Sequence, residues 1–236
     1  MTDSIRQQII EAMMAKAAEI RIDKGYHTDM GKNIISYDRY NATLPFVAIW
    51  AGLEEIDREY GHTRAQMQVR VEGVQEYATG DRMELSEQML ADIIENIAGI
   101  KWTLDFTSGG THKPSAGDAI VGATGGAAGI IESFSLDSGS WSGGDAAGSF
   151  VIRRKVGTFS AENLNIGGES NVATTDGTIA AESAEESTAN NLADDIQYVS
   201  GGLEEFPEAQ DEIVGMVANF LITYPIILGN PYSQPS

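Results

Sequence analysis

The chain has 236 residues, enough for one or two domains with a buried core. Its 15 Lys and Arg residues are outnumbered by 35 Asp and Glu residues, and the formal net charge of −20 disfavours tight binding to nucleic-acid phosphates. The absence of cysteine excludes disulfides and thiolate chemistry, and no apolar run is long enough to span a membrane. The N-terminal residues show no signal-peptide pattern, so we expect a protein that is made and used in a cytoplasm.

The N-terminal third begins with a helix pattern and continues with two strand patterns. Residues 2–22 place their apolar side chains on one stripe, which predicts an amphipathic helix. Residues 44–53 are apolar at nearly every position, as in a strand that is covered on both faces. Residues 65–73 alternate between apolar and polar side chains, as in a strand with one buried and one wet face. The acidic residues 54–63 between them are expected to form the connection.

A second helix is predicted after these strands. Asp81 suits the cap position, Glu84 follows three residues later, and an apolar stripe continues until Gly99 ends it. Residues 100–106 are expected to form a third strand.

The composition then changes to one dominated by Gly, Ala, Ser and Thr. Short apolar runs persist within residues 107–170 between glycine-rich turns, which predicts a small all-β module, a barrel or a sandwich. Residues 171–191 are acidic and rich in small residues, as in a flexible tether. Two further strand patterns follow within residues 192–236.

These patterns predict an α+β fold that is interrupted by a β-domain. Residues 1–106 and 192–236 would form a mixed or antiparallel sheet of about four strands with two helices on one face. Residues 107–170 would be an inserted domain, which a surface loop tolerates because closing a longer loop costs little.

The sequence contains no recognisable catalytic, cofactor or metal constellation. His27, His62 and His112 lie apart in polar segments, without the spacing of metal ligands. The glycine-rich stretch from Gly122 to Gly129 lacks the Lys-Ser/Thr of a phosphate loop and is better explained by turns. Asp137 and Asp145 could supply oxygen ligands to Ca²⁺, but no calcium-loop pattern accompanies them. We therefore expect a protein that is not an enzyme.

Several stretches outside the β-domain resemble the tail terminator, or tail completion, proteins of tailed bacteriophages. The resemblance covers about residues 1–105 and 194–232, and it depends on the order and pattern of five stretches. They are the N-terminal helix, LPFVAIWAGLEEIDREYG, RAQMQVRVEG, ADIIENIAG and GGLEEFPEAQDEIVGMVANFLITYPIILGNPY. The β-domain is similar to small β-modules of phage virion proteins and departs from the minimal terminator pattern.

The resemblance implies a structural protein of the virion. Proteins of that family form a hexameric ring at the head-proximal end of the tail tube, stop its polymerisation and receive the head connector. DNA would pass through such a ring without specific binding, and strong negative charge would help it to slide, although ordinary solubility explains the same charge.

Aromatic and basic side chains are the expected contacts between subunits. Trp50 suits core packing equally well, and the basic pair suits a plain exposed strand end. The expected interface residues are Tyr26, Tyr37, Tyr40, Trp50, Arg153 and Arg154.

Two alternatives to the ring remain open at this point. In one, the β-domain is a glycan- or surface-binding module, which would need a solvent-facing aromatic platform around Trp141 and Phe159. In the other, the chain is a tail tube subunit, which would polymerise without closing a ring.

Overall fold

The chain folds into two units in the computed structural model, which describes residues 3–36, 43–59, 62–77, 80–175, 182–185, 189–204 and 213–235. The first unit, here called the core unit, contains Met1–Arg21, Tyr26–Gly99 and Ser187–Ser236. The second, here called the barrel unit, contains Ile22–Gly25 and Ile100–Glu186. The predicted boundaries of the β-domain are therefore wrong at both ends, since residues 100–106 and 171–186 also belong to the barrel unit.

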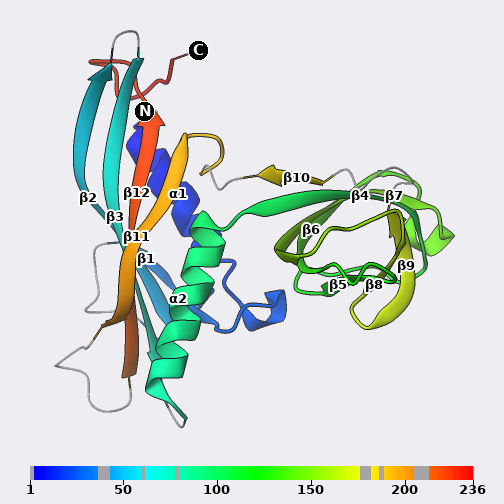
Figure 1. The fold of residues 1–236 in the computed structure, drawn as a ribbon. Coiled ribbons are helices and arrows are strands. Elements are labelled where there is room, and N and C mark those ends of the chain that lie inside the picture. Colours follow the sequence, from blue (N-terminus) through cyan, green and yellow to red (C-terminus); the bar gives the residue numbers. More distant parts are fainter. Residues whose placement is uncertain are drawn as a thin grey trace. The chain divides into compact units, whose positions relative to one another are not determined.

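The core unit is built on a five-stranded sheet instead of the expected four strands (Figure 1). The β1 strand pairs in parallel with β2, and every other pairing is antiparallel, so the sheet is mixed, which is one of the two predicted arrangements. In spatial order its strands are β1 (Ile34–Ser36), β2 (Phe46–Glu59), β3 (His62–Glu76), β12 (Ile213–Pro225) and β11 (Asp195–Glu204).

The central hairpin of this sheet is longer than the sequence suggests. Residues 46–49 of β2 are buried, in agreement with the apolar run, but the strand then continues through the acidic residues to Glu59. The expected connection at residues 54–63 is thus mostly strand. A β-bulge between Ala51 and Glu54 shifts the alternation there, and such a shift hides the strand period from a sequence reading.

Two helices cover one face of the sheet, as predicted (Figure 1). The first, α1 (Ile5–Ala17), is shorter than residues 2–22 and begins at Ser4, whose side chain accepts from Gln7 N at 3.2 Å. The second, α2 (Arg82–Ala98), has the predicted cap, because Asp81 Oδ1 accepts from Met83 N at 2.8 Å, and Gly99 ends it. Their apolar stripes share one core with the inward side chains of β3 and β12.

The barrel unit contains a closed six-stranded barrel (Figure 1). It closes because β4 pairs with β7 along one edge and with β9 along the other. A further strand, β10 (Glu182–Glu185), pairs with β4 beside β9. Around the barrel the strands are β4 (Lys101–Gly109), β7 (Ala146–Val156), β6 (Ala128–Ser138), β5 (Ala119–Gly122), β8 (Asn163–Ile166) and β9 (Glu169–Thr175).

Two predictions about the segments that flank the β-domain are wrong. The strand at residues 100–106 was expected in the core sheet, but as β4 it belongs to the barrel. Residues 171–191 were expected to be a tether, but they include the end of β9 and all of β10. The buried positions of β9 are Val172, Ala173 and Thr175, and such small side chains give a weak hydrophobic pattern even where a barrel wall covers them.

Candidate functional site

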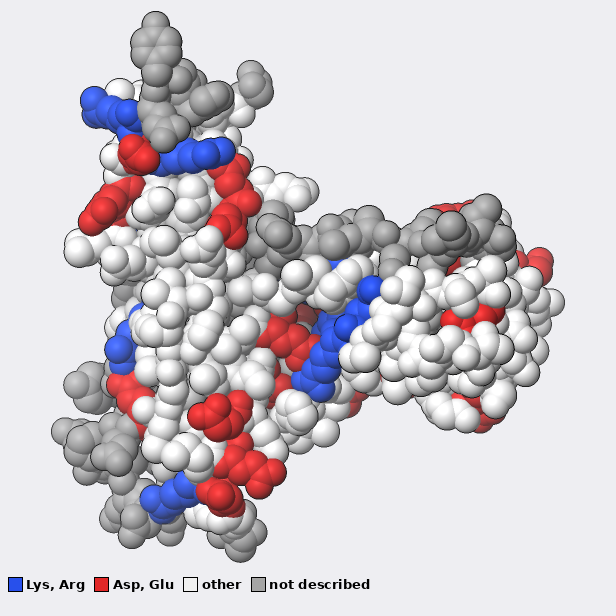
Figure 2. Space-filling view, viewed as in Figure 1, with Lys and Arg blue, Asp and Glu red and all other residues white. Residues whose placement is uncertain are grey.

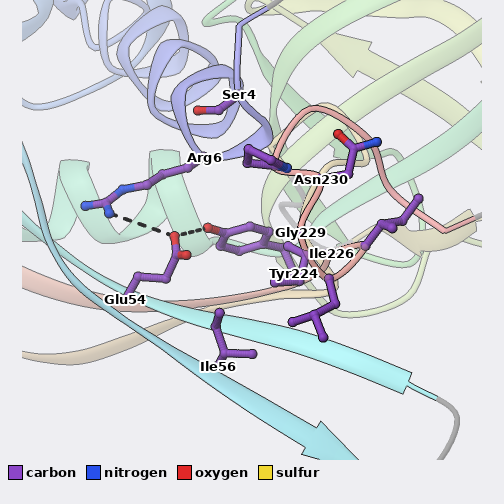
Figure 3. A pocket seen from close by; sticks show the side chains of 11 residues that line it. Ser4, Arg6, Glu54, Ile56, Tyr224, Ile226, Gly229 and Asn230 are labelled. Atoms are coloured by element: carbon purple, nitrogen blue, oxygen red, sulfur yellow. Dashed lines mark hydrogen bonds and ion pairs between the residues drawn. The ribbon is translucent and has the colours of Figure 1, made fainter.

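A pocket of about 330 Å³ opens in the core unit where α1 begins and β12 ends (Figure 3). The chain brings together three distant segments at this point. They are the first turn of α1, the bulged half of β2 and the turn after β12, which contains an isolated bridge from Ile227 to Asn230. The lining residues used below are Arg6, Glu54, Ile56, Tyr224, Ile227 and Leu228.

The base of the pocket is polar. The Tyr224 hydroxyl donates a hydrogen bond to Glu54 Oε2, and Arg6 Nη1 lies 3.8 Å from the same oxygen (Figure 3). A second nitrogen of Arg6, Nη2, donates to Gly52 O at 2.6 Å. Burial, together with the neighbouring Glu54 carboxylate, raises the pKa of the Tyr224 hydroxyl above its usual range. Tyr224 therefore remains a protonated donor that holds Glu54 in place.

The bulge in β2 determines where Glu54 points. After the register shift Glu54 lies opposite Met67, a side chain that is buried in the core beneath the helices. Without the bulge the alternation would place position 54 on the other face of the sheet. Glycine at position 52 was the one available sequence signal, because a glycine within a strand often marks a bulge.

The turn after β12 is fixed by backbone hydrogen bonds at its two ends. Ile226 N donates to Thr63 O at 3.1 Å, and Pro231 O accepts from Ile5 N at 2.9 Å. The second bond satisfies one of the N–H groups that the first turn of a helix leaves without an intrahelical partner. The turn is thus part of the core unit and holds its own side chains at the mouth of the pocket.

The mouth of the pocket carries aliphatic side chains that water can reach. Ile227 and Leu228 are exposed on the turn, and Ile56 is 48% exposed on β2. Leu53, at the bulge of the same strand, is 74% exposed. A polar base with an aliphatic mouth has the composition of a protein interface, which combines apolar contact with a few polar groups.

Tyr224 is 2% exposed and engaged with Glu54, so it is not positioned as a reactive group. Among the described residues, no group of three or more His, Asp or Glu could hold a metal ion. Of the two candidate calcium ligands, Asp145 accepts a hydrogen bond from Ser140 N at 2.9 Å and so closes a turn.

The structure buries two of the six expected interface residues. Tyr26 is 6% exposed, and its hydroxyl accepts from Asn96 Nδ2 at 3.0 Å on α2. Arg153 is 1% exposed and donates to the backbone oxygen of Lys24. The expectation that these two side chains are exposed is therefore wrong, because hydrogen bonds with partners distant in sequence satisfy their polar groups in the interior.

The other four expected interface residues have mixed outcomes. Trp50 is half-buried and packs against a small apolar cluster of Phe46, Ala48 and Val74 on the sheet face away from the helices. Arg154 is half-buried on β7, in a left-handed backbone conformation. Tyr37 and Tyr40 lie outside the described residues. Tyr26 and Trp50 belong to the core unit, and Arg153 and Arg154 belong to the barrel unit.

The glycine-rich stretch from Gly122 to Gly129 forms the turn between β5 and β6, as predicted. Its backbone N–H groups do bind an anion, but the anion is the protein's own Glu162. Glu162 Oε2 accepts from Thr124 N at 2.6 Å and Gly125 N at 2.7 Å, and Oε1 accepts from Ser160 N at 3.2 Å. Burial opposes the charge of Glu162, but these hydrogen bonds outweigh it and lower its pKa to about 2.

The aromatic residues of the barrel face inward. Trp141 is 6% exposed and stacks on Phe106 with ring centroids 5.3 Å apart, and Phe150 also stacks on Phe106 at 4.2 Å. Phe159 is fully buried. The solvent-facing platform that glycan binding would need is therefore not formed by Trp141 and Phe159.

Within the described parts of the chain, no helix is both long and apolar enough to cross a membrane. In a comparison with known proteins, no protein-family model and no curated protein matches the chain.

Proposed function

We propose that this chain is a structural subunit of a bacteriophage tail, one that forms a ring at the head-proximal end of the tail tube. The ring would end polymerisation of the tube and join the tail to the head connector. Its subunits would be made in the bacterial cytoplasm and remain in the neck of the virion. This function follows from the sequence resemblance, and the core unit has the kind of fold that the resemblance implies, a sheet with helices on one face.

The observation that carries the proposal is the placement of apolar side chains at opposite edges of the five-stranded sheet. At one edge, β1 covers only Val47–Ile49 of β2, and beyond that segment Leu53 and Ile56 are exposed. At the other edge, β11 pairs with β12 alone among the described strands and exposes Tyr198, Val199 and Leu203. Ring closure requires two different surfaces on each subunit, and edges on opposite sides of one sheet satisfy that requirement.

The charge distribution is compatible with a DNA conduit. Acidic side chains are scattered over both units on the face drawn in Figure 2 and do not form a single patch. The net charge of −20 would repel a passing duplex and so prevent it from binding tightly.

The alternatives have less support. Burial of Trp141 and Phe159 counts against a glycan-binding surface at the site where the sequence suggested one. A tail tube subunit would use the same two edges, but the contact would repeat without closing.

The proposal is tested on the full-length protein by light scattering and negative-stain imaging. We expect closed rings, with or without added tube protein. Lysine at either edge, Leu53→Lys or Val199→Lys, should abolish them, because a charge at the centre of an apolar contact is not compensated. Met83→Lys adds the same charge at an exposed position on α2 and should leave rings intact.

Two outcomes would contradict the proposal. Open-ended tubes would show that the chain is a tail tube subunit and not a terminator. If both lysine variants still form rings, the sheet edges are not the surfaces that join the subunits.

A further inference from the structure

Four residues of the N-terminal region, Ile22–Gly25, belong to the barrel unit and not to the core unit that surrounds them in sequence. The chain passes from Arg21 into this segment and returns at Tyr26. It therefore changes unit four times, after residues 21, 25, 99 and 186, where a simple insertion would need two changes. We call Ile22–Gly25 the strap.

A side-chain hydrogen bond and a close approach of two backbones connect the strap to the rest of the barrel unit. The buried guanidinium of Arg153 on β7 donates to Lys24 O. Two glycines in the left-handed region, Gly25 and Gly117, let the backbones approach closely. A Cβ added at Gly117 would lie 2.7 Å from Asp23 O and 2.7 Å from the carbonyl carbon of Lys24, closer than real Cβ contacts come.

The strap buries little apolar surface. Its one aliphatic side chain, Ile22, is 59% exposed, and Asp23 is exposed as well. Segments with few buried apolar contacts open locally at a much lower free energy than the whole unit unfolds. Local opening of the strap should therefore require less free energy than unfolding of the barrel.

We propose that the strap is a releasable clasp: Arg153 and the Gly25–Gly117 approach hold Ile22–Gly25 on the barrel, and opening reduces the connections between the units from four to two. Release frees four residues of chain, with a contour length of about 13 Å. The neighbouring residues stay anchored in the core unit. Asp92 on α2, fully buried, accepts from Thr28 N at 2.8 Å and His27 N at 3.0 Å.

The Lys24–Gly25 peptide bond gives a direct readout of the clasp. Trypsin cleaves after lysine, but only when the backbone can leave its folded position, so cleavage here reports opening. We would follow the appearance of the fragment 1–24 by mass spectrometry during brief digestion of the full-length protein. Cleavage after Lys101 and Lys155, two sites that all four variants keep, reports unfolding of the barrel in the same samples.

Two variants and two matched controls separate the clasp from general destabilisation. Arg153→Gln removes the charged donor, and Arg154→Gln makes the same charge change at the next residue. Gly117→Ala places a methyl group against the strap. Gly126→Ala also places a side chain on a left-handed backbone, but nothing lies within 4 Å of its new Cβ.

The expected result is selective. Arg153→Gln and Gly117→Ala should each speed cleavage after Lys24 by at least about tenfold, the effect of losing one charged hydrogen bond, while the controls match the wild type. Cleavage at the barrel sites should stay unchanged in all four. Equal rates after Lys24 in the variants and their controls would overturn the clasp, and so would cleavage that rises equally at the barrel sites.

Discussion

Glu162 and Thr124 are joined by two hydrogen bonds to one oxygen: Glu162 Oε2 accepts from Thr124 N at 2.6 Å and from Thr124 Oγ1 at 2.8 Å. The pair ties the residue before β8 to the turn between β5 and β6. Because these donors favour the ionised form, the folded pKa of Glu162 is about 2, below its ordinary value of 4.5. The contribution to barrel stability is therefore fully present above pH 4.5 and is lost as the pH falls towards 2.

Glu162→Gln should remove this contribution. We expect the variant to be less stable than the wild type by about 1–3 kcal/mol at neutral pH, since buried donors lose a charged acceptor. The difference should shrink between pH 4.5 and 2. Thermal unfolding followed by near-UV circular dichroism measures it, because Trp102 and Trp141 both lie in the barrel unit. Glu169→Gln, exposed on β9, is the control, and a pH-independent difference would contradict the role of the Glu162 charge.

The pocket in the core unit offers a test of coupling between Tyr224 and Glu54. A double-mutant cycle with Tyr224→Phe and Glu54→Gln should give a coupling free energy of about 1–2 kcal/mol, because the hydroxyl donates to a charged oxygen. The matched cycle uses Glu55→Gln, since Glu55 is the next residue on β2 and lies opposite Gln66, on the other sheet face. Urea unfolding measures both cycles. Equal coupling free energies in the two cycles would mean that the hydrogen bond from Tyr224 to Glu54 makes no specific contribution to stability.

Tyr26 should matter for stability and not for assembly. Tyr26→Phe removes the acceptor of Asn96 Nδ2 and should cost about 1 kcal/mol of unfolding free energy. Ring formation should be unchanged, because the side chain is buried in the core unit. Tyr232→Phe, at a position 54% exposed, serves as the control and should change neither quantity. Loss of rings with unaltered stability would restore Tyr26 as an interface residue.

Trp141 should be required for the barrel and for nothing in the core unit. Trp141→Ala removes a buried ring that stacks on Phe106, and such truncations cost about 3–5 kcal/mol. Hydrogen exchange should therefore rise in peptides from β4, β6 and β7 but not in peptides from β12. Val156→Ala, at an exposed position of β7, should leave exchange unchanged. A variant with a folded barrel that has lost binding to bacterial surfaces would instead favour the glycan-binding alternative.

Salt should strengthen the assembled state. Subunits with a net charge of −20 repel one another, and dissolved ions screen this repulsion within about 10 Å at 0.1 M. The mass measured by light scattering should therefore rise from low to moderate sodium chloride concentration at fixed protein concentration. Dissociation on adding salt would show that ion pairs, and not the apolar sheet edges, hold the subunits together.

The sequence by itself determined the class of fold and several of its parts. The period of 3.6 residues in α2, its Asp81 cap and its end at Gly99 all agree with the structure, because helix periodicity and capping are local properties. The alternation of β3 and the β-character of the glycine-rich region agree for the same reason. Composition also indicated that the stretch from Gly122 to Gly129 is a turn.

Only the tertiary structure decided which sheet each strand joins and which polar residues are buried. The sequence of β4 fits a strand of the core sheet as well as a strand between β7 and β9, because the pairing partners are remote in sequence. The pocket depends on a bulge that reorients Glu54 towards Tyr224, 170 residues away in sequence. Arg153 looked like a surface cation, yet it is buried because Lys24 O, contributed by a distant segment, accepts its hydrogen bond. Contacts of this kind are absent from any local pattern, because the donor and the acceptor meet only when the chain folds.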